Sequence, residues 1–265
     1  MPTMQLIDDT AIEPPEDITW GCELEAHGVS GYDEGDELPQ EFRDLITQLV
    51  MVQADLETEL VFDTTVIRAF VLNGPDPRSR MRMAKFFAEE IGHGYTFWKI
   101  AKTLGVELTP AYFRAVKRKR QEAFANVGLV DDWTELAIVN TLTDRMGTFL
   151  FNDMADCAYL PWARISESVA KDEAGHASLG YANLSDAVRR RGKRADAQHY
   201  LEKWYPMSLD MFGRSDTNRQ WRYVAWGLKH TGNEKMRRMW ANEVGPLLEN
   251  LDLEVPDYMW NRKFL

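Results

Sequence analysis

Cysteine is scarce in this chain. Its 265 residues include two cysteines, Cys22 and Cys157. Two are too few for a disulfide framework, and their spacing does not match a zinc or iron–sulfur motif. Long apolar runs are missing as well, because no uncharged stretch approaches the ~20 residues that span a bilayer. No basic and then apolar leader opens the sequence, so a cytoplasmic protein is expected.

Positive charge is also in short supply. The chain has 42 acidic residues against 31 Lys and Arg, which gives a net charge of −11. Nonspecific binding to nucleic acid or to an anionic membrane needs a cationic face, so neither partner is expected. A glycine-rich phosphate-binding loop is missing too. What remains is an ordinary globular composition, with 45% hydrophobic and 28% charged residues, in a chain long enough to bury a sizeable core.

Strand signals are weak, since the sequence has no sustained alternation of polar and apolar residues and no Asn-Gly hairpin. Helical periodicity dominates from Glu41 onward, interrupted by breakers such as Asn73-Gly74-Pro75, Gly105 and Gly192. Helices are predicted over residues 41–72, 77–104, 109–123, 132–158, 161–191, 194–212, 216–231 and 233–250. Asp132 is expected to cap the fourth of these helices. The predicted fold class is all-α.

The chain divides into four segments. Residues 1–40 are rich in acids and proline and lack periodicity, which predicts an extended acidic arm with Trp20 and Tyr32 as docking points. Residues 41–192 are expected to form an antiparallel four-helix bundle. Residues 193–250 would add further helices packed on the bundle, and residues 251–265 an irregular tail.

Two Glu-x-x-His motifs, Glu90/His93 and Glu173/His176, lie on the second and fourth long helices. Three residues along a helix correspond to about 300° of rotation, so each Glu and His project from one face. Two such motifs, with one carboxylate from each of two other helices, are the ligand set of di-iron and di-manganese bundles. A single motif is more often a solvated surface pair. The paired occurrence favours a metal centre.

Helical phase selects the carboxylate expected from the first long helix. With Leu45 set to zero, an apolar line lies within about 40° of it. Its members are the apolar Leu49, Val52 and Leu56, and Asp63 clusters at the same angle. Glu59 falls at about −40°, inside this line, whereas Glu57 falls at about 120°. Glu59 is therefore the predicted ligand.

The third long helix offers Asp144 in the same way. Trp133, Ala137 and Asn140 lead along one face to Asp144. The two half-sites then match in form. Their predicted metal-binding and catalytic residues are Glu59, Glu90 and His93 in the first and Asp144, Glu173 and His176 in the second.

An acid precedes the glutamate of each motif. A ligating histidine usually donates its other N–H to a carboxylate or carbonyl. Asp172 could therefore serve His93, and Glu89 could serve His176, each across the bundle. The alternative is that both acids are ordinary helix charges, and the sequence leaves the two interpretations equal.

These motifs carry a resemblance to a known family. The matching residues are Glu59 with Glu90-Ile-Gly-His93-Gly, Trp133 with Leu142-Thr-Asp144-Arg, Lys171-Asp-Glu173-Ala-Gly-His176, Asp210-Met-Phe-Gly, Ala225-Trp-Gly-Leu-Lys229 and Asn250-Leu-Asp-Leu-Glu-Val-Pro-Asp257. From about residue 45 the chain resembles the phenylacetic acid catabolic family of ferritin-like di-iron proteins. The resemblance implies a ferritin-like bundle with additional C-terminal helices, and an Asp at the position of Asp144 is similar to the family pattern.

The resemblance also implies an activity. Two iron ions, with manganese as an alternative, would activate O2 and oxygenate an aromatic acyl-CoA thioester such as phenylacetyl-CoA, as an epoxide. Electrons would come from NADPH through a separate reductase carrying flavin and a 2Fe–2S cluster. A sister ferritin-like subunit or a second copy of the chain is the expected partner. The alternatives are another di-metal oxidoreductase with a non-CoA substrate and a ferroxidase or iron-binding protein.

The substrate site is weakly marked. Basic clusters that could meet CoA phosphates are Arg78, Arg80 and Arg82; Arg114, Lys117, Arg118, Lys119 and Arg120; and Arg189, Arg190, Arg191, Lys193 and Arg194. Cations favoured near helix C-termini explain most of them better. Tyr95, Phe97 and Trp98 could line an aromatic pocket or belong to the core. Phe97 stands where radical-bearing ribonucleotide reductase subunits have a Tyr, which counts against that class.

Overall fold

The computed structural model describes residues 14–62, 73–123, 130, 132–215 and 217–257, and for residues 58–62, 116, 117 and 119–123 it describes the backbone alone. The helices are α1 (Cys22–Ala26), α2 (Gln40–Phe62), α4 (Pro77–Thr103), α5 (Pro110–Ala123), α6 (Trp133–Asp153), α7 (Leu160–Arg191), α8 (Arg194–Met211), α9 (Asn218–Ala225) and α10 (Asn233–Glu249). Among the described residues there is no strand, and one isolated bridge joins Tyr32 to Tyr159. The all-α prediction is confirmed.

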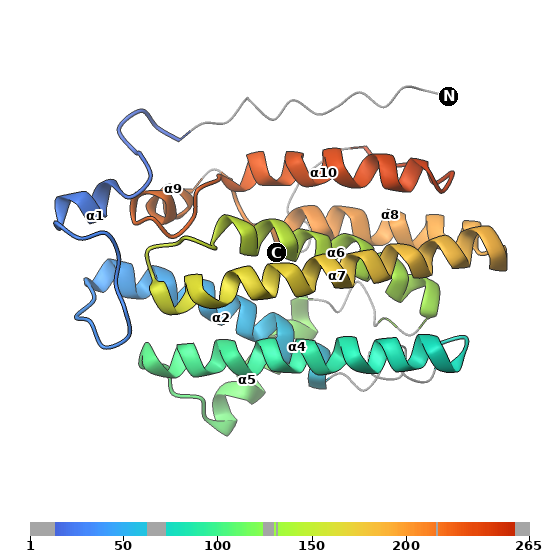
Figure 1. The fold of residues 1–265 in the computed structure, drawn as a ribbon, viewed down its shortest axis with the longest axis horizontal. Coiled ribbons are helices and arrows are strands. Elements are labelled where there is room, and N and C mark those ends of the chain that lie inside the picture. Colours follow the sequence, from blue (N-terminus) through green and yellow to red (C-terminus); the bar gives the residue numbers. More distant parts are fainter. Residues whose placement is uncertain (1–13, 63–72, 124–129, 131, 216, 258–265) are drawn as a thin grey trace.

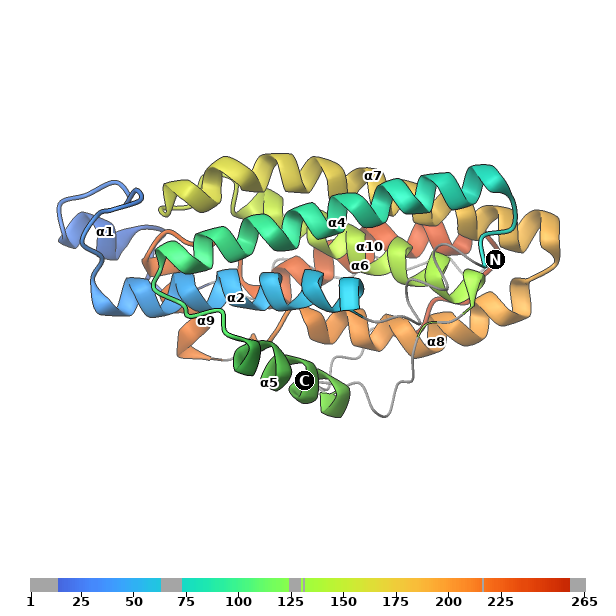
Figure 2. The ribbon, with the colours of Figure 1, turned by 90° about the horizontal axis from the view of Figure 1, so that it is seen from below.

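Four long helices form the bundle. α6 packs along α7 and α2 along α4, and the two pairs meet where α4 lies against α7 (Figure 1). α8 and α10 pack on the other side of α6. From below, α4 and α7 lie on one side of the molecule, with α5 and α8 towards the other (Figure 2). This is a ferritin-like bundle with additional C-terminal helices, as the sequence predicts.

Local sequence signals explain where the bundle helices begin and end. Asp76 caps α4 by accepting a hydrogen bond from the Ser79 amide at 2.9 Å. Asp132 caps α6 by accepting from the Thr134 amide at 2.7 Å, as predicted. α7 ends at Arg191 and is capped by Gly192, which takes a left-handed φ of 67° that favours glycine. These residues fix the length of each helix facing the centre of the bundle.

Two predicted helices are shorter than expected. The helix expected over 216–231 ends at Ala225, because Gly227 takes a left-handed φ of 64° and turns the chain. The helix expected over 132–158 ends at Asp153. Beyond it, the Tyr32 amide donates to the Ala158 carbonyl at 2.8 Å, so this stretch pairs with the N-terminal segment instead.

The described part of the N-terminal segment lies against the bundle. It contains the five-residue helix α1, which the extended arm of the prediction lacks. Tyr32 is buried and packs on Phe42, with ring centroids 4.7 Å apart. Trp20 stacks on His230 at 4.6 Å. Both aromatic side chains therefore contact the rest of the fold.

The C-terminal helices hold α6 from outside the bundle. The Trp240 indole on α10 donates to the Leu142 carbonyl on α6 at 3.0 Å. The buried Glu135 on α6 accepts from Lys203 at 2.5 Å and from the Trp204 indole at 2.8 Å, both on α8. No helix in the described ranges is long and apolar enough to cross a membrane.

Candidate metal centre

A cluster of three glutamates and one histidine lies between α2, α4 and α7. Glu57 comes from α2, Glu90 and His93 from α4, and Glu173 from α7. One ligand atom of each lies within 4.8 Å of the others, and all four side chains are buried. A group of this size and composition could hold a metal ion.

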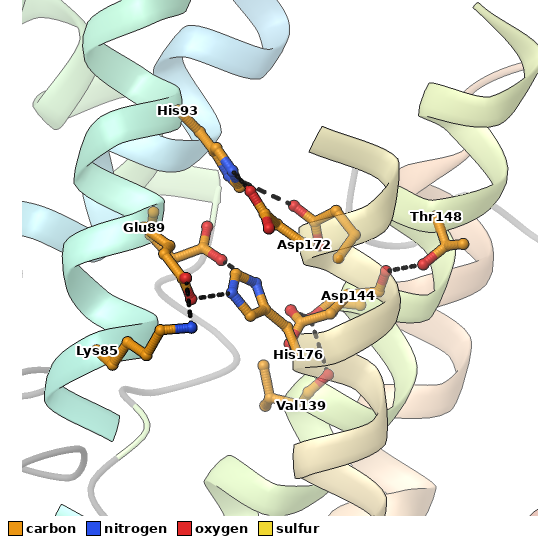
Figure 3. Close-up of polar contacts among 11 residues, drawn as sticks. Lys85, Glu89, His93, Val139, Asp144, Thr148, Asp172 and His176 are labelled. Carbon is orange, nitrogen blue, oxygen red and sulfur yellow. Dashed lines mark hydrogen bonds and ion pairs between the residues drawn. The ribbon is translucent and has the colours of Figure 1, made fainter. Parts of the chain in front are cut away.

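The two Glu-x-x-His motifs face each other across the α4–α7 contact (Figure 3). Nδ1 of His176 lies 2.6 Å from Oε1 of Glu90, and Nδ1 of His93 lies 3.9 Å from Oε1 of Glu173. The imidazole rings are 6.1 Å apart between centroids. The histidine of each motif is therefore directed at the glutamate of the other.

Several atoms of the cluster residues, and of their neighbours Asp144 on α6 and His176 on α7, are buried without a hydrogen bond. They are Oε2 of Glu57, Oε1 of Glu90, Nδ1 of His93, Oδ2 of Asp144 and Nδ1 of His176. Buried polar atoms in folded proteins nearly always have partners, and an unsatisfied one is costly. Carboxylate oxygens and imidazole nitrogens suit iron or manganese. These residues therefore fit a bound metal, which would satisfy the unpartnered atoms.

The outer nitrogens of both histidines contact the acids that the sequence singled out. Nε2 of His93 lies 3.3 Å from Oδ2 of Asp172, and Nε2 of His176 lies 3.1 Å from Oε2 of Glu89 (Figure 3). Lys85 in turn contacts Glu89 at 2.8 Å. Such contacts fix the ring orientation and leave each Nδ1 directed at the cluster.

The protonation of the cluster reflects its burial. Burial raises the pKa of Glu90 to about 8 and that of Asp144 to about 7. Burial also raises the pKa of Glu57 and Glu173 well above the ordinary range, and the charge of Glu90 adds to both effects. Four carboxyl groups this close cannot all ionise without a cation among them. The bare cluster therefore retains protons that a metal would displace.

Aromatic side chains surround the histidines. Phe86 contacts the His176 ring edge-on at 4.3 Å, and Phe97 lies 6.2 Å from the His93 ring. Phe97 is fully buried and packs on Phe151 and Trp162, so it belongs to the core. These rings keep one side of the cluster apolar.

The position of Gly147 on α6 is a feature that sequence reasoning missed. A Cβ at this position would lie 2.8 Å from Oε2 of Glu173, well inside van der Waals contact. The glycine therefore makes room for the Glu173 carboxylate between α6 and α7. The available signal was a glycine in a helix interior, three residues after Asp144, where glycine is otherwise unfavourable.

The prediction for α2 was wrong about Glu57. Helical phase predicts Glu57 off the core, but its side chain is 7% exposed and lies in the cluster. Val52, at the centre of the assumed apolar line, is 48% exposed instead. The buried line runs through Phe42, Ile46, Val50, Gln53 and Glu57. The side chain of Glu59 lies outside the described residues.

The basic and aromatic residues that the sequence suggested for a substrate site make other contacts. The third basic cluster contacts the turn that follows α10, with Arg189 donating to the Asn250 carbonyl at 2.8 Å and Arg194 to the Asp252 carbonyl at 2.7 Å. Tyr95 is 61% exposed on the outside of α4, so it does not line a buried aromatic pocket. Trp98 packs on Phe113 at 4.9 Å.

The fold and the cluster together define a ferritin-like helical protein with a candidate metal centre. More specifically, the chain belongs to the phenylacetic acid catabolic protein family, whose model matches residues 30–264.

Two curated relatives are similar to it. One is a 1,2-phenylacetyl-CoA epoxidase subunit from Escherichia coli (strain K12), which is 25% identical over 194 residues, covering 71% of this chain and 62% of that protein. The other is component B of benzoyl-CoA oxygenase from Aromatoleum evansii, which is 23% identical over 264 residues, covering 86% of this chain and 52% of that protein. The chain therefore spans less than two thirds of either relative.

Proposed function

We propose that the cluster holds two iron ions and that this chain is the oxygen-activating subunit of a monooxygenase. The observation that carries the proposal is the set of buried, unpartnered carboxylate and imidazole atoms contributed by both Glu-x-x-His motifs and by Glu57 and Asp144. The proposed ligands are Glu57, Glu90, His93, Asp144, Glu173 and His176.

Glu57 takes the place that phase analysis assigned to Glu59. Positions two apart on an α-helix differ by about 200°, so a single helix directs only one of them at a given neighbour. Since Glu57 lies within the cluster, it is the ligand that we propose from α2.

The proposed substrate is an aromatic acyl-CoA thioester, epoxidised on its ring. Its support is the chemistry of the two relatives, an epoxidase of phenylacetyl-CoA and an oxygenase of benzoyl-CoA. Two bound ferrous ions would supply the electrons that reduce O2. We further propose that NADPH reduces them through a separate flavin and 2Fe–2S reductase, and that a sister subunit or a second copy completes the assembly.

The residues of the chain have distinct tasks in this proposal. Asp172 and Glu89 hold the imidazole rings by their outer nitrogens. Phe86 and Phe97 exclude water from the histidine side of the centre. The carboxyl groups give up their protons when the metal enters, because a ligating carboxylate is ionised.

Metal analysis tests the first part of the proposal. Protein produced with ample iron should contain about two metal ions per chain. The Glu173→Ala/His176→Ala double variant should lose them, whereas a His199→Ala variant, altered outside the cluster, should keep them. Full metal content in the double variant would rule out this site.

Product analysis tests the second part. The reduced, iron-loaded chain is exposed to O2 with phenylacetyl-CoA, benzoyl-CoA or the corresponding free acids. Mass spectrometry should detect a thioester that has gained one oxygen atom. Oxygenation of the free acids alone would point to a non-CoA hydroxylase, and formation of iron mineral without any oxygenated product would point to iron storage.

A further inference from the structure

The outer faces of α4 and α7 are uncovered by the described part of the chain. Both helices lie on one side of the molecule (Figure 2), and His93 and His176 lie between them (Figure 3). Large apolar side chains on the outside of α4 are exposed there, with Met81 at 67%, Ile91 at 40% and Tyr95 at 61%. An exposed group of large apolar side chains is typical of an interaction surface.

No packing contact in the described part of the chain requires the two glycines on this face. Gly92 and Gly175 occupy the same position in the two Glu-x-Gly-His motifs, and a Cβ at either would meet nothing within 4 Å. Glycine is among the least favourable residues in a helix interior. By contrast, Gly180 is explained by its packing, since a Cβ there would lie 2.7 Å from the Thr141 amide nitrogen. Bare backbone at Gly92 and Gly175 allows another protein to approach closely.

The face is basic although the chain as a whole is acidic, with a net charge of −11. Exposed cations on α4 and α7 include Arg82, Lys85, Lys99 and Lys171, and also Arg164, which pairs with Asp33. The acids on these helices include the exposed Glu167 and the partly exposed Glu89 and Asp172. The acids nearest the metal centre, Glu89 and Asp172, contact its histidines. A second copy presenting the same face would be repelled, whereas an acidic partner would be attracted.

The side chains of this face lie close to the histidines of the metal centre. Lys85, which is exposed, contacts Glu89 at 2.8 Å, and Glu89 contacts the His176 ring at 3.1 Å. Asp172 has a side chain that is 40% exposed and lies 3.3 Å from the His93 ring. A protein bound here is separated from the ligand histidines by a single layer of side chains.

We infer that the α4–α7 face, defined by Met81, Lys85, Gly92, Tyr95, Lys99, Lys171 and Gly175, binds an acidic electron-donating protein. The electron-donating role rests on the proposed function, in which the bound iron must be reduced. The acidic character of the partner rests on the charge of the face alone. Docking here would place the donor against the two glycines, over the histidine side of the centre.

The inference is tested with a plant-type 2Fe–2S ferredoxin, an acidic one-electron carrier. Its binding to the full chain is measured by titration calorimetry at low and high salt, with and without iron. Binding should be detectable at low salt and weaken as salt rises. A Lys99→Glu/Lys171→Glu variant should bind at least about tenfold more weakly, and Gly175→Gln should do the same without a lower Tm.

Matched variants on α5 serve as controls. Arg114→Glu/Arg118→Glu reverses two exposed cations, and Ala115→Gln enlarges an exposed helical residue, both away from the face. Binding equal to that of the unaltered chain is expected. The inference is overturned if the ferredoxin does not bind at low salt, or if the α5 variants weaken binding as much as the face variants. It is also overturned if Gly175→Gln dissociates a dimer of the chain alone, since the occupant is then a second copy.

This design separates the two proposals. If the chain binds the ferredoxin through this face but never holds iron, the docking surface stands and the proposed function fails. If the chain oxygenates its substrate with a chemical reductant but does not bind the ferredoxin, the function stands and the docking surface fails. Reduction of the iron by ferredoxin at a rate that falls in the face variants supports both.

Discussion

Nδ1 of His176 lies 2.6 Å from Oε1 of Glu90, yet neither atom takes part in a hydrogen bond. The two residues come from different motifs on α7 and α4, and both side chains are buried. Both atoms can donate an electron pair to a metal. Because they lie this close without a hydrogen bond between them, they are arranged to bind the same cation. Metal binding should depend on this relationship and on the residues that maintain it.

Removing the carboxylate behind His176 should weaken metal binding. Glu89→Ala takes away the group that holds Nε2 of His176 and is expected to lower metal affinity by about 10- to 100-fold, because outer partners orient the ligand. Metal affinity is measured by competition with a chelator of known strength. Glu167→Ala on the exposed side of α7 is the control and should leave the affinity unchanged. Equal affinity in all three proteins would show that Glu89 is an ordinary helix charge.

Two glycines should respond to alanine in opposite ways. A Cβ at Gly147 would press on the Glu173 carboxylate, so Gly147→Ala should lower the free energy of unfolding by about 1–3 kcal/mol and reduce metal content. Gly175→Ala meets open space and should raise the free energy of unfolding by about 0.4–1 kcal/mol with metal retained. Urea unfolding and metal analysis measure both effects. Loss of stability in Gly175→Ala would contradict the open environment of that position.

The metal-free protein should lose stability as pH rises. Burial raises the pKa of Glu90 from 4.5 to about 8 and that of Asp144 from 3.8 to about 7. Between these values the unfolded chain is ionised while the folded chain still holds its protons. The folded state then binds more protons, so rising pH favours unfolding. Thermal unfolding from pH 4 to 8 should therefore give a falling Tm for the metal-free chain.

The metal-bound protein should behave differently over the same range. A ligating carboxylate has already lost its proton, so metal binding releases protons and strengthens as pH rises. The gap in Tm between the metal-bound and metal-free forms should widen towards pH 8. A constant gap would mean that the raised carboxyl groups do not bind the metal.

Arg237 on α10 should matter for stability and not for metal content. It is fully buried, pairs with Glu234 and donates to the Leu209 carbonyl at 2.8 Å. Arg237→Ala leaves buried partners unpaired and should cost about 3–5 kcal/mol in the free energy of unfolding. Lys193→Ala, which removes an exposed ion pair with Asp196, should cost less than about 1 kcal/mol. Metal content per folded chain should stay the same in both variants, and its loss in Arg237→Ala would place that residue in the support of the centre.

Much of the site could be predicted because it depends on local geometry. Glu90 and His93, and likewise Glu173 and His176, share a helix face at any i, i+3 spacing, and Asp132 and Gly192 mark helix ends by their own backbone preferences. The acids beside each motif could be assigned to the opposite histidine only as one of two equal interpretations. The structure has those contacts, because α4 and α7 lie side by side.

The sequence by itself determined the helices, the pairing of the two motifs and the kind of ligand atoms they offer, since each depends on residues within a few positions of one another. Only the tertiary structure decided that Glu57 enters the cluster. α2 carries apolar residues around much of its circumference, and its rotation is set by packing against α4. The close approach of α6 to α7 at Gly147 and Gly180 was decided in the same way. Steric fit between helices distant in sequence is not encoded in the periodicity of either one.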